Sequence, residues 1–419
     1  MKLYFLSLSF IILSVLFPLN AASQSSGYDA SDLKGNKEGY IALSDNPEVF
    51  FGVYPGKKEI VLVKYDSALN KLDTFILDNP LGKLKDIVGA TVKNDLIYLY
   101  SYDKKWGNHK LDLSVFIIDP VAGTLTRQEL PTNNDEAQAS FVSINDGKFI
   151  GMSIRINILK IYMFDGKDAV FTKELNIADY ITPSGSDTTV MALPLIKTTE
   201  QIAYTDEAIF IQIEDALIKV PLNAQKAVFY TPTSNCKKCS TTSRFFGNML
   251  ITAEKQDGKV SFVTYQLPEM KVIDKLRFTS KLSIEPYDKY TGHTTVKNYS
   301  SVLKIFEKGD HEISLQNLGN MGAFINISSY EMRIGNTNPI TNVQTSDSRS
   351  AEITLAVDKE GNFKKGEPTA EEFEFYNTMK GVAESQHYNS FLLDGKVYLH
   401  GKVNGPSGLK DYYKIKRAK

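Results

Sequence analysis

The sequence predicts an all-β protein made of repeated antiparallel hairpins, on three observations. Short apolar runs separated by turn residues follow one another from about Tyr40 onward, with almost no apolar residues at helical spacing. The chain holds 22 tyrosines and 23 phenylalanines but one tryptophan, and tyrosine and phenylalanine suit pleated sheets. A strand–turn–strand unit, first seen in Lys58–Leu77, recurs along the sequence.

The turns of these hairpins recur with the period of a four-stranded blade. They fall near positions 66, 119, 165, 222, 267, 308 and 358. Successive gaps run from 41 residues (308 minus 267) to 57 residues (222 minus 165), and propeller blades repeat every 40 to 50 residues or so. A lone four-stranded sheet cannot bury both of its faces, so such units close radially into a ring. The sequence therefore predicts a single β-propeller of seven blades, with six or eight blades as alternatives.

In repeat length and hairpin shape the chain resembles the WD40-like and kelch-like β-propellers of exported bacterial proteins. The Trp-Asp dipeptide and Gly-His signature of WD40 repeats and the double glycine of kelch repeats are absent. The resemblance therefore implies a fold, and it implies no activity.

The N-terminus has the plan of a cleavable signal peptide. Lys2 supplies the positive charge, Phe5–Leu19 is an apolar run, and Ala21 and Ala22 precede a polar stretch. The alternative is a retained membrane anchor, for which the apolar run is short. We expect a signal peptide over residues 1–22, a flexible segment over 23–39 and the propeller domain over 40–419. The mature chain would not insert in a membrane and would be periplasmic or extracellular.

The last blade is one strand short in the sequence. After the strand Lys396–Lys402 only Asp411–Ile415 remains, so a strand around Tyr40–Leu43 is expected to complete this blade and close the ring.

Two segments depart from the hairpin pattern. A short helical insertion is expected near residues 369–380, where Thr369 and Glu372 form a capping box. The polar stretch Gly335–Ser350 has no apolar period and is expected to be a long loop or a hydrated edge.

Charge and motifs exclude several classes of function. The formal net charge is −1 and no basic stripe is present, so nucleic acid is not an expected partner. No phosphate-binding loop, dinucleotide-binding glycine pattern, GxSxG or HExxH motif occurs. No cofactor and no metal site are expected.

Cys236 and Cys239 are the two cysteines of the chain. In an oxidising compartment a pair at this spacing is expected to form a small disulfide that pins a loop. Free or metal-bound thiols and a redox pair are the alternatives. The helix that follows a βαβ unit in redox proteins is not predicted here.

Aromatic and histidine residues gather in two predicted loops. In a propeller, connections from second to third strand and from one blade to the next emerge on one face. We therefore expect a ligand-binding face carrying Trp106, His109, Tyr287, Tyr290 and His293. The plainer interpretation is that Trp106 covers its own hairpin. By contrast, His400 alternates with an apolar residue in a strand and is expected to be a core or edge histidine.

These patterns predict an exported, non-catalytic binding or scaffold propeller that recognises a protein or a surface polysaccharide through one loop face. The alternative is a polysaccharide-acting hydrolase or lyase, whose groove would bring aromatic residues together with carboxylates or a His–Tyr pair. A redox or metal role through Cys236 and Cys239 is a third hypothesis.

Overall fold

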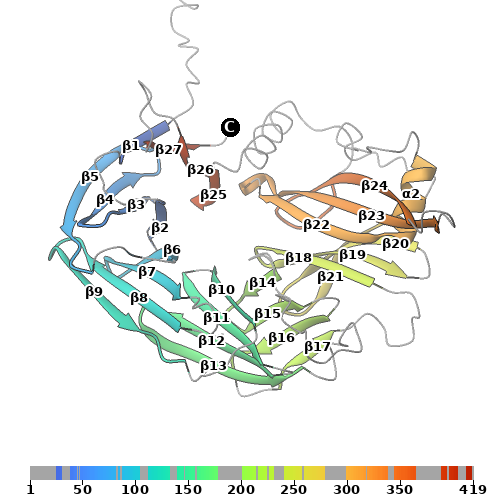
Figure 1. Ribbon diagram of the computed structural model, residues 1–419, viewed down its shortest axis with the longest axis horizontal. Coiled ribbons are helices and arrows are strands. Elements are labelled where there is room, and N and C mark those ends of the chain that lie inside the picture. Colours follow the sequence, from blue (N-terminus) through green and yellow to red (C-terminus); the bar gives the residue numbers. More distant parts are fainter. Residues whose placement is uncertain are drawn as a thin grey trace, which may run out of the picture.

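The computed structural model confirms an all-β chain arranged as a propeller. It describes residues 25–30, 38–44, 46, 48–81, 84, 87–103, 112–132, 139–145, 147–155, 158–177, 201–213, 216–223, 226–230, 240–256, 259–278, 299–317, 319–337, 344–364, 388–393, 396–403 and 412–417. The sheets follow one another in chain order around a central axis (Figure 1). β2, β6 and β10 lie near this axis, whereas β5, β9 and β13 lie at the rim (Figure 1).

The first sheet has eight strands in the order β5-β4-β3-β2-β6-β7-β8-β9. Its strands are β2 (Tyr40–Leu43), β3 (Val49–Pro55), β4 (Glu59–Asp66), β5 (Lys71–Asp78), β6 (Ile87–Lys93), β7 (Leu96–Asp103), β8 (Asp112–Asp119) and β9 (Thr124–Glu129). Each half of the sheet, β2–β5 and β6–β9, is an antiparallel run of four strands.

Three four-stranded antiparallel sheets follow. The first holds β10 (Ala139–Asn145), β11 (Lys148–Arg155), β12 (Ile158–Asp165) and β13 (Asp168–Asn176). The second holds β14 (Ile202–Tyr204), β15 (Ala208–Ile213), β16 (Ala216–Pro221) and β17 (Val228–Tyr230). The third holds β18 (Ser240–Phe246), β19 (Met249–Gln256), β20 (Lys259–Gln266) and β21 (Lys271–Phe278).

Two further sheets complete the described fold. Helix α2 (Tyr299–Lys308) leads into a three-stranded sheet of β22 (Asp310–Asn317), β23 (Ala323–Thr337) and β24 (Gln344–Val357), with the 3₁₀ turn η3 (Gly319–Met321) between β22 and β23. The last sheet has the order β1-β27-β26-β25, from β1 (Ser25–Asp29), β25 (Tyr388–Leu393), β26 (Lys396–Val403) and β27 (Tyr412–Arg417).

The predicted count of seven separate blades is wrong. The described strands form six sheets, of which five contain antiparallel runs of four strands and one has three strands. The cause is a parallel pairing between β2 and β6, with Ala42 opposite Ala90 and Leu43 opposite Thr91. This pairing joins two runs into the one eight-stranded sheet, and spacing along the sequence does not reveal it.

The strand expected to complete the last blade is also wrong. Tyr40–Leu43 is β2, which pairs with β3 and β6. The N-terminal strand in the last sheet is β1, whose residue Ser25 lies opposite Lys416 of β27. Residues 23–39, expected to be flexible, therefore contain a paired strand.

The expected turn at 308 and the expected loop at 335–350 are corrected as well. The run before Lys308 forms helix α2, which buries Ile305 and Phe306 against the neighbouring sheets. Strands β23 and β24 extend into the polar stretch, as far as Thr337 and from Gln344 onward. The expected helix near 369–380 and the signal peptide 1–22 lie outside the described residues.

The core lies in the seams between neighbouring sheets. Strand β4 shows the principle, because alternate residues of a strand face opposite sides of its sheet. Its Ile60 and Leu62 join a cluster shared by the two halves of the eight-stranded sheet. Its Val61 and Val63 join a second cluster, which contains Tyr398 of the last sheet.

Side chains also tie sheets together through the turns. A side chain from a middle strand of one run donates a hydrogen bond to a backbone carbonyl in the third-to-fourth-strand turn of the next. Within the described residues such bonds run from Tyr398 to Ser67 (2.6 Å), Tyr100 to Gly166 (3.3 Å) and Lys219 to Pro268 (3.0 Å), and Thr264 likewise donates to Gly361 (2.6 Å) in the turn after β24.

The strands of each antiparallel run begin and end on two opposite sides of the propeller. We call turn edge the side where the first strand turns into the second and the third into the fourth, and loop edge the opposite side; neither term refers to an outermost strand of a sheet. Turn edges of neighbouring runs contact each other, since Asp165 Oδ2 lies 2.9 Å from Lys93 Nζ and 2.7 Å from Lys148 Nζ.

Within the described ranges, neither helical segment has the length and apolar content that a bilayer crossing needs.

Substitutions at two glycines with positive φ distinguish the cost of an unfavourable backbone conformation from the cost of a steric clash. Gly322 has φ +103°, and a Cβ there would lie 2.0 Å from the carbonyl oxygen of Val357, whereas Gly123 has φ +66° and open space around it. We expect Gly123→Ala to cost about 1 kcal/mol of unfolding free energy and Gly322→Ala at least about 2 kcal/mol more. Urea unfolding of both variants measures this, and equal losses would contradict it.

Candidate functional site

The loop edge carries several long connections beside short turns such as Arg155 to Ile158 and Gln256 to Lys259, and the connection from Val357 to Tyr388 starts at the turn edge. Short turns link strands at the turn edge, from Asp66 to Lys71, Asp119 to Thr124, Asp165 to Asp168 and Phe246 to Met249. Long connections leave the loop edge, from Asp103 to Asp112, Asn176 to Ile202, Tyr230 to Ser240 and Phe278 to Tyr299. Long connections in compact domains are uncommon, and they often carry function.

All residues predicted for the ligand-binding face belong to these long connections. Trp106 and His109 follow β7, and Tyr287, Tyr290 and His293 follow β21. These residues lie outside the described part of the chain, so their side-chain positions remain a prediction. Both connections leave strands, β7 and β21, that end at the loop edge.

Cys236 and Cys239 lie in the connection from β17 to β18, which also leaves the loop edge. Both are outside the described residues, so the disulfide remains a prediction.

Beneath this edge, the seam between β14–β17 and β18–β21 changes from apolar to polar. Toward the turn edge it is filled by Ala203, Phe210, Phe245 and Leu250. Two residues further toward the loop edge, on the same strand faces, stand Gln201, Gln212, Ser243 and Thr252. These four side chains are 1–6% exposed. We call this group the polar seam.

One hydrogen bond between the two sheets and one within the first sheet stabilise the polar seam. The Ser243 hydroxyl donates to Gln212 Oε1 over 2.5 Å, and Gln201 Nε2 donates to the Gln212 backbone carbonyl over 3.2 Å. Buried amides and hydroxyls are costly when they lack partners. The seam therefore keeps satisfied polar groups buried beneath the loop edge.

A carboxylate continues this group toward the loop edge. Glu254 Oε1 accepts a hydrogen bond from the Tyr265 hydroxyl and another from Thr252 Oγ1 over 3.3 Å, while Lys275 Nζ lies 3.6 Å from Glu254 Oε2. Burial raises the pKa of Tyr265 above its ordinary value, and the hydrogen bond to Glu254 raises it further. The phenol therefore stays protonated near neutral pH and acts as a hydrogen-bond donor there.

The neighbouring seam has apolar side chains at the equivalent positions near the loop edge, so the buried polar side chains are specific to the polar seam. Between β10–β13 and β14–β17, the corresponding positions near the loop edge are Ile154, Leu159 and Ile213, all buried and apolar. The polar seam was missed from the sequence. Its one visible signal is Gln212, the single polar residue in the strand AIFIQI.

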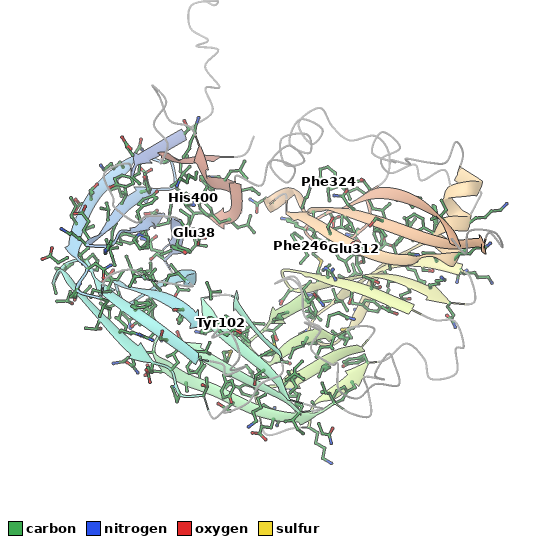
Figure 2. All side chains as sticks on the ribbon, viewed as in Figure 1. Glu38, Tyr102, Phe246, Glu312, Phe324 and His400 are labelled. Atoms are coloured by element: carbon green, nitrogen blue, oxygen red, sulfur yellow. The ribbon has the colours of Figure 1, made fainter. Side chains whose placement is uncertain are left out.

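His400 is a core histidine, as the sequence predicts, and it lies away from the polar seam. It sits in β26 of the last sheet (Figure 2), and its ring centroid lies 6.2 Å from that of Tyr54 in β3. The side chain is 3% exposed, and burial lowers its pKa from 6.5 to about 4. It is therefore neutral in the folded protein near pH 7.

The described residues contain no group of three or more His, Cys, Asp or Glu side chains placed as metal ligands. Within this part of the chain the site offers amide, hydroxyl and carboxylate groups for hydrogen bonding.

Comparison with known proteins identifies no family. No family model matches the chain, and no curated protein matches it. Solved structures align weakly: a structure titled Dos1 propeller has 12% identity and TM-score 0.32 over 78% of this chain and 68% of that chain. A prolyl endopeptidase has 13% identity and TM-score 0.38 over 93% and 50%. The apocarotenoid oxygenase of Synechocystis has 9% identity and TM-score 0.32 over 57% and 61%.

The aligned part thus spans half of that endopeptidase and less than two thirds of that oxygenase. At these values of identity and TM-score the likenesses carry no conclusion about activity or ligand.

Removing one partner of the polar seam should destabilise the protein more than removing both. Ser243→Ala deprives the buried Gln212 Oε1 of its donor, which should lower the unfolding free energy by about 1–3 kcal/mol. Adding Gln212→Met should recover part of this loss, because the two positions are coupled. Urea unfolding of the two single variants and the double variant gives the coupling; strictly additive losses would show that the bond contributes nothing.

Stability should fall in acid because of His400. Above pH 6.5 neither the folded nor the unfolded chain protonates this residue. As pH drops from 6.5 to 4, only the unfolded chain gains the proton, so the unfolding free energy falls by about 3 kcal/mol. In His400→Asn this part of the pH dependence should disappear. Denaturant unfolding from pH 7 to 4 compares the two proteins, and identical slopes would rule His400 out.

Proposed function

We propose that the protein is a non-catalytic binding or scaffold propeller that recognises a protein or a surface glycan through its loop edge. The observation that carries this proposal is that the long connections after β7, β13, β17 and β21 all leave the loop edge, where short second-to-third-strand turns accompany them. A rigid scaffold that positions long loops at one face is the usual plan of a recognition surface.

The polar groups of the turn edge are engaged in their own turns. Asp66 Oδ1 accepts from the Asn70 backbone over 2.7 Å, and Asp66 Oδ2 accepts from Asn70 Nδ2 over 2.8 Å. Asp358 and Asn362 repeat this arrangement in another turn. Such local bonds stabilise turns, so we assign the turn edge a structural role.

The polar seam favours a hydrogen-bonding partner at the loop edge over a purely apolar one. Its amides and hydroxyls, with Glu254 and Tyr265 beyond them, form a polar floor next to the connection that holds Cys236 and Cys239. The raised pKa of Tyr265 makes this tyrosine a poor general base at neutral pH.

We further propose that residues 1–22 direct export to the periplasm or the cell exterior and that β1 fastens the ring. Support for the second point comes from the pairing of β1 with β27 and from Tyr28, whose ring stacks on Tyr54 of β3 at 4.6 Å. Strand β1 thus contacts both the last sheet and the first.

A binding screen with paired variants tests the proposed face. The chain from Ser23 onward, which contains every described element, is assayed by thermal shift against soluble polysaccharides and peptidoglycan fragments. A ligand at 100 times its Kd adds about 2.7 kcal/mol of stability. Trp106→Ala and Tyr287→Ala should each weaken a hit about tenfold without lowering the melting temperature of the free protein. The control is Val121→Ala, at an exposed position on the turn edge, and it should leave binding unchanged.

Each outcome selects one hypothesis. A hit without products supports a glycan-binding module, whereas released oligosaccharides would support the alternative hydrolase or lyase. With no hit, a pull-down from an envelope extract tests the protein partner. Binding that is lost in Val121→Ala but kept in Trp106→Ala and Tyr287→Ala would overturn the assignment of the loop edge.

A further inference from the structure

The sheet β18–β21 reaches further toward the loop edge than the sheet β14–β17. Both sheets carry a residue of the polar seam on their second strand, Gln212 in β15 and Thr252 in β19. β15 ends at Ile213, one residue beyond Gln212, whereas β19 ends at Gln256, four residues beyond Thr252. Three more residues of a strand add about 10 Å. The loop end of β18–β21 therefore extends past the sheet next to it in the ring (Figure 1).

Over this extension, the face of β18–β21 that continues the polar seam becomes charged. Glu254 lies opposite Ser261, and Ser261 lies opposite Arg277. Residues directly opposite each other, and residues two apart on one strand, share a face of the sheet. We call basic face the group Glu254, Lys259, Ser261, Lys275 and Arg277. Its three cationic side chains are exposed and its glutamate and serine are half-buried, so it carries a charge of +2 in a chain whose formal net charge is −1.

Two other runs lack this positive charge at the corresponding positions. A β-bulge interrupts the pairing of the third and fourth strands in three runs, and it aligns them with one another. Counted from the bulge, Arg277 corresponds to Glu174 of β13 and to Ile76 of β5. Glu174 Oε1 lies 2.8 Å from Lys160 Nζ, so these two charges cancel, and Ile76 is apolar. Among these three runs the excess of positive charge belongs to β18–β21.

The charged groups of the basic face can act together on one ligand. Lys275 Nζ lies 3.6 Å from Glu254 Oε2, which is longer than a hydrogen bond, and the two side chains are 45% and 28% exposed. Arginine binds a carboxylate through two parallel hydrogen bonds, and lysine adds a point charge. Glu254 accepts hydrogen bonds from hydroxyl groups and repels anions. The strands β20 and β21 thus favour a carboxylate, and β19 favours hydroxyl groups.

We infer that the basic face binds a polysaccharide whose sugar residues carry carboxylate groups, as uronic acids do. Arg277 and Lys275 bind the carboxylate of the sugar, and Glu254 accepts hydrogen bonds from its hydroxyl groups. A phosphate polyanion fits this face less well, because Glu254 repels it, and an acidic peptide offers few hydroxyl groups. This inference rests on the proposed function and names the class of glycan that the loop edge recognises.

A comparison of acidic and neutralised glycans tests the inference. The chain from Ser23 onward is titrated calorimetrically with polygalacturonate, alginate and hyaluronate, which between them present four different uronic acids. At least one of these polymers should bind. Methyl-esterified polygalacturonate, whose carboxylates are blocked, should bind at least about tenfold more weakly than the best acidic polymer. Raising the salt from about 0.1 M to about 1 M shortens the Debye length from about 10 Å to about 3 Å and should also weaken binding.

Matched variants locate the binding site. Arg277→Gln and Lys275→Gln should each raise the Kd for the acidic polymer at least about tenfold, because each removes a charge-assisted hydrogen bond. Both side chains are exposed, so the melting temperature of the free protein should not change. Lys271→Gln removes the same charge from the turn-edge end of the same strand, β21, where Lys271 is also exposed. This control should leave the Kd unchanged.

Several results would overturn the inference. They are equal binding of the esterified and acidic polymers, equal Kd values for Arg277→Gln and Lys271→Gln, and no binding of any of the three acidic polymers. Tighter binding of polyglutamate or oligothymidylate than of every acidic polysaccharide would assign the face to a different partner. The proposed function is judged separately: if Trp106→Ala and Tyr287→Ala weaken binding of a neutral glycan or a protein and Arg277→Gln does not, recognition at the loop edge stands and this inference fails.

Discussion

A β-sheet with two apolar faces cannot be stable alone, and this constraint organises the whole molecule. Each described core cluster takes its side chains from neighbouring runs of strands, as Ile60 and Val61 of β4 show by joining different clusters. Each run therefore buries an apolar face of its neighbours and depends on them to bury its own. Turns and inter-sheet hydrogen bonds then fix the spacing, as the bond from Tyr100 to Gly166 does between adjacent sheets.

Local chemistry made much of this fold predictable from the sequence. Turns at Asp66, Asp119 and Asp165 were predicted because Asp and Gly favour tight turns between apolar runs. The turn expected at 308 was wrong because a short apolar run fits a strand or a helix equally well. The parallel pairing of Ala42 with Ala90 joins segments far apart in the chain, so no local sequence pattern predicts it.

The candidate site was only partly predictable, for a related reason. Long polar connections with aromatic residues are visible in the sequence, and the strand ends place those connections at one edge. The polar seam was not visible, because Gln201, Gln212 and Ser243 come from three different strands. Each looks like a single polar interruption in its own segment. Strand pairing brings Gln201 to Gln212 within one sheet, and the packing of a second sheet brings Ser243 within hydrogen-bond distance of Gln212.

The pairing of Ser25 with Lys416 has a consequence for the order of folding. The ribosome synthesises the N-terminus first, so β1 has no strand to pair with until residues 412–417 have emerged. The entropy cost of closing so long a loop makes this contact a late event, and folds dominated by distant contacts are slow to form. Until β27 emerges, the nascent protein is a growing stack of sheets whose first apolar face, around Tyr54 and Val63, remains uncovered.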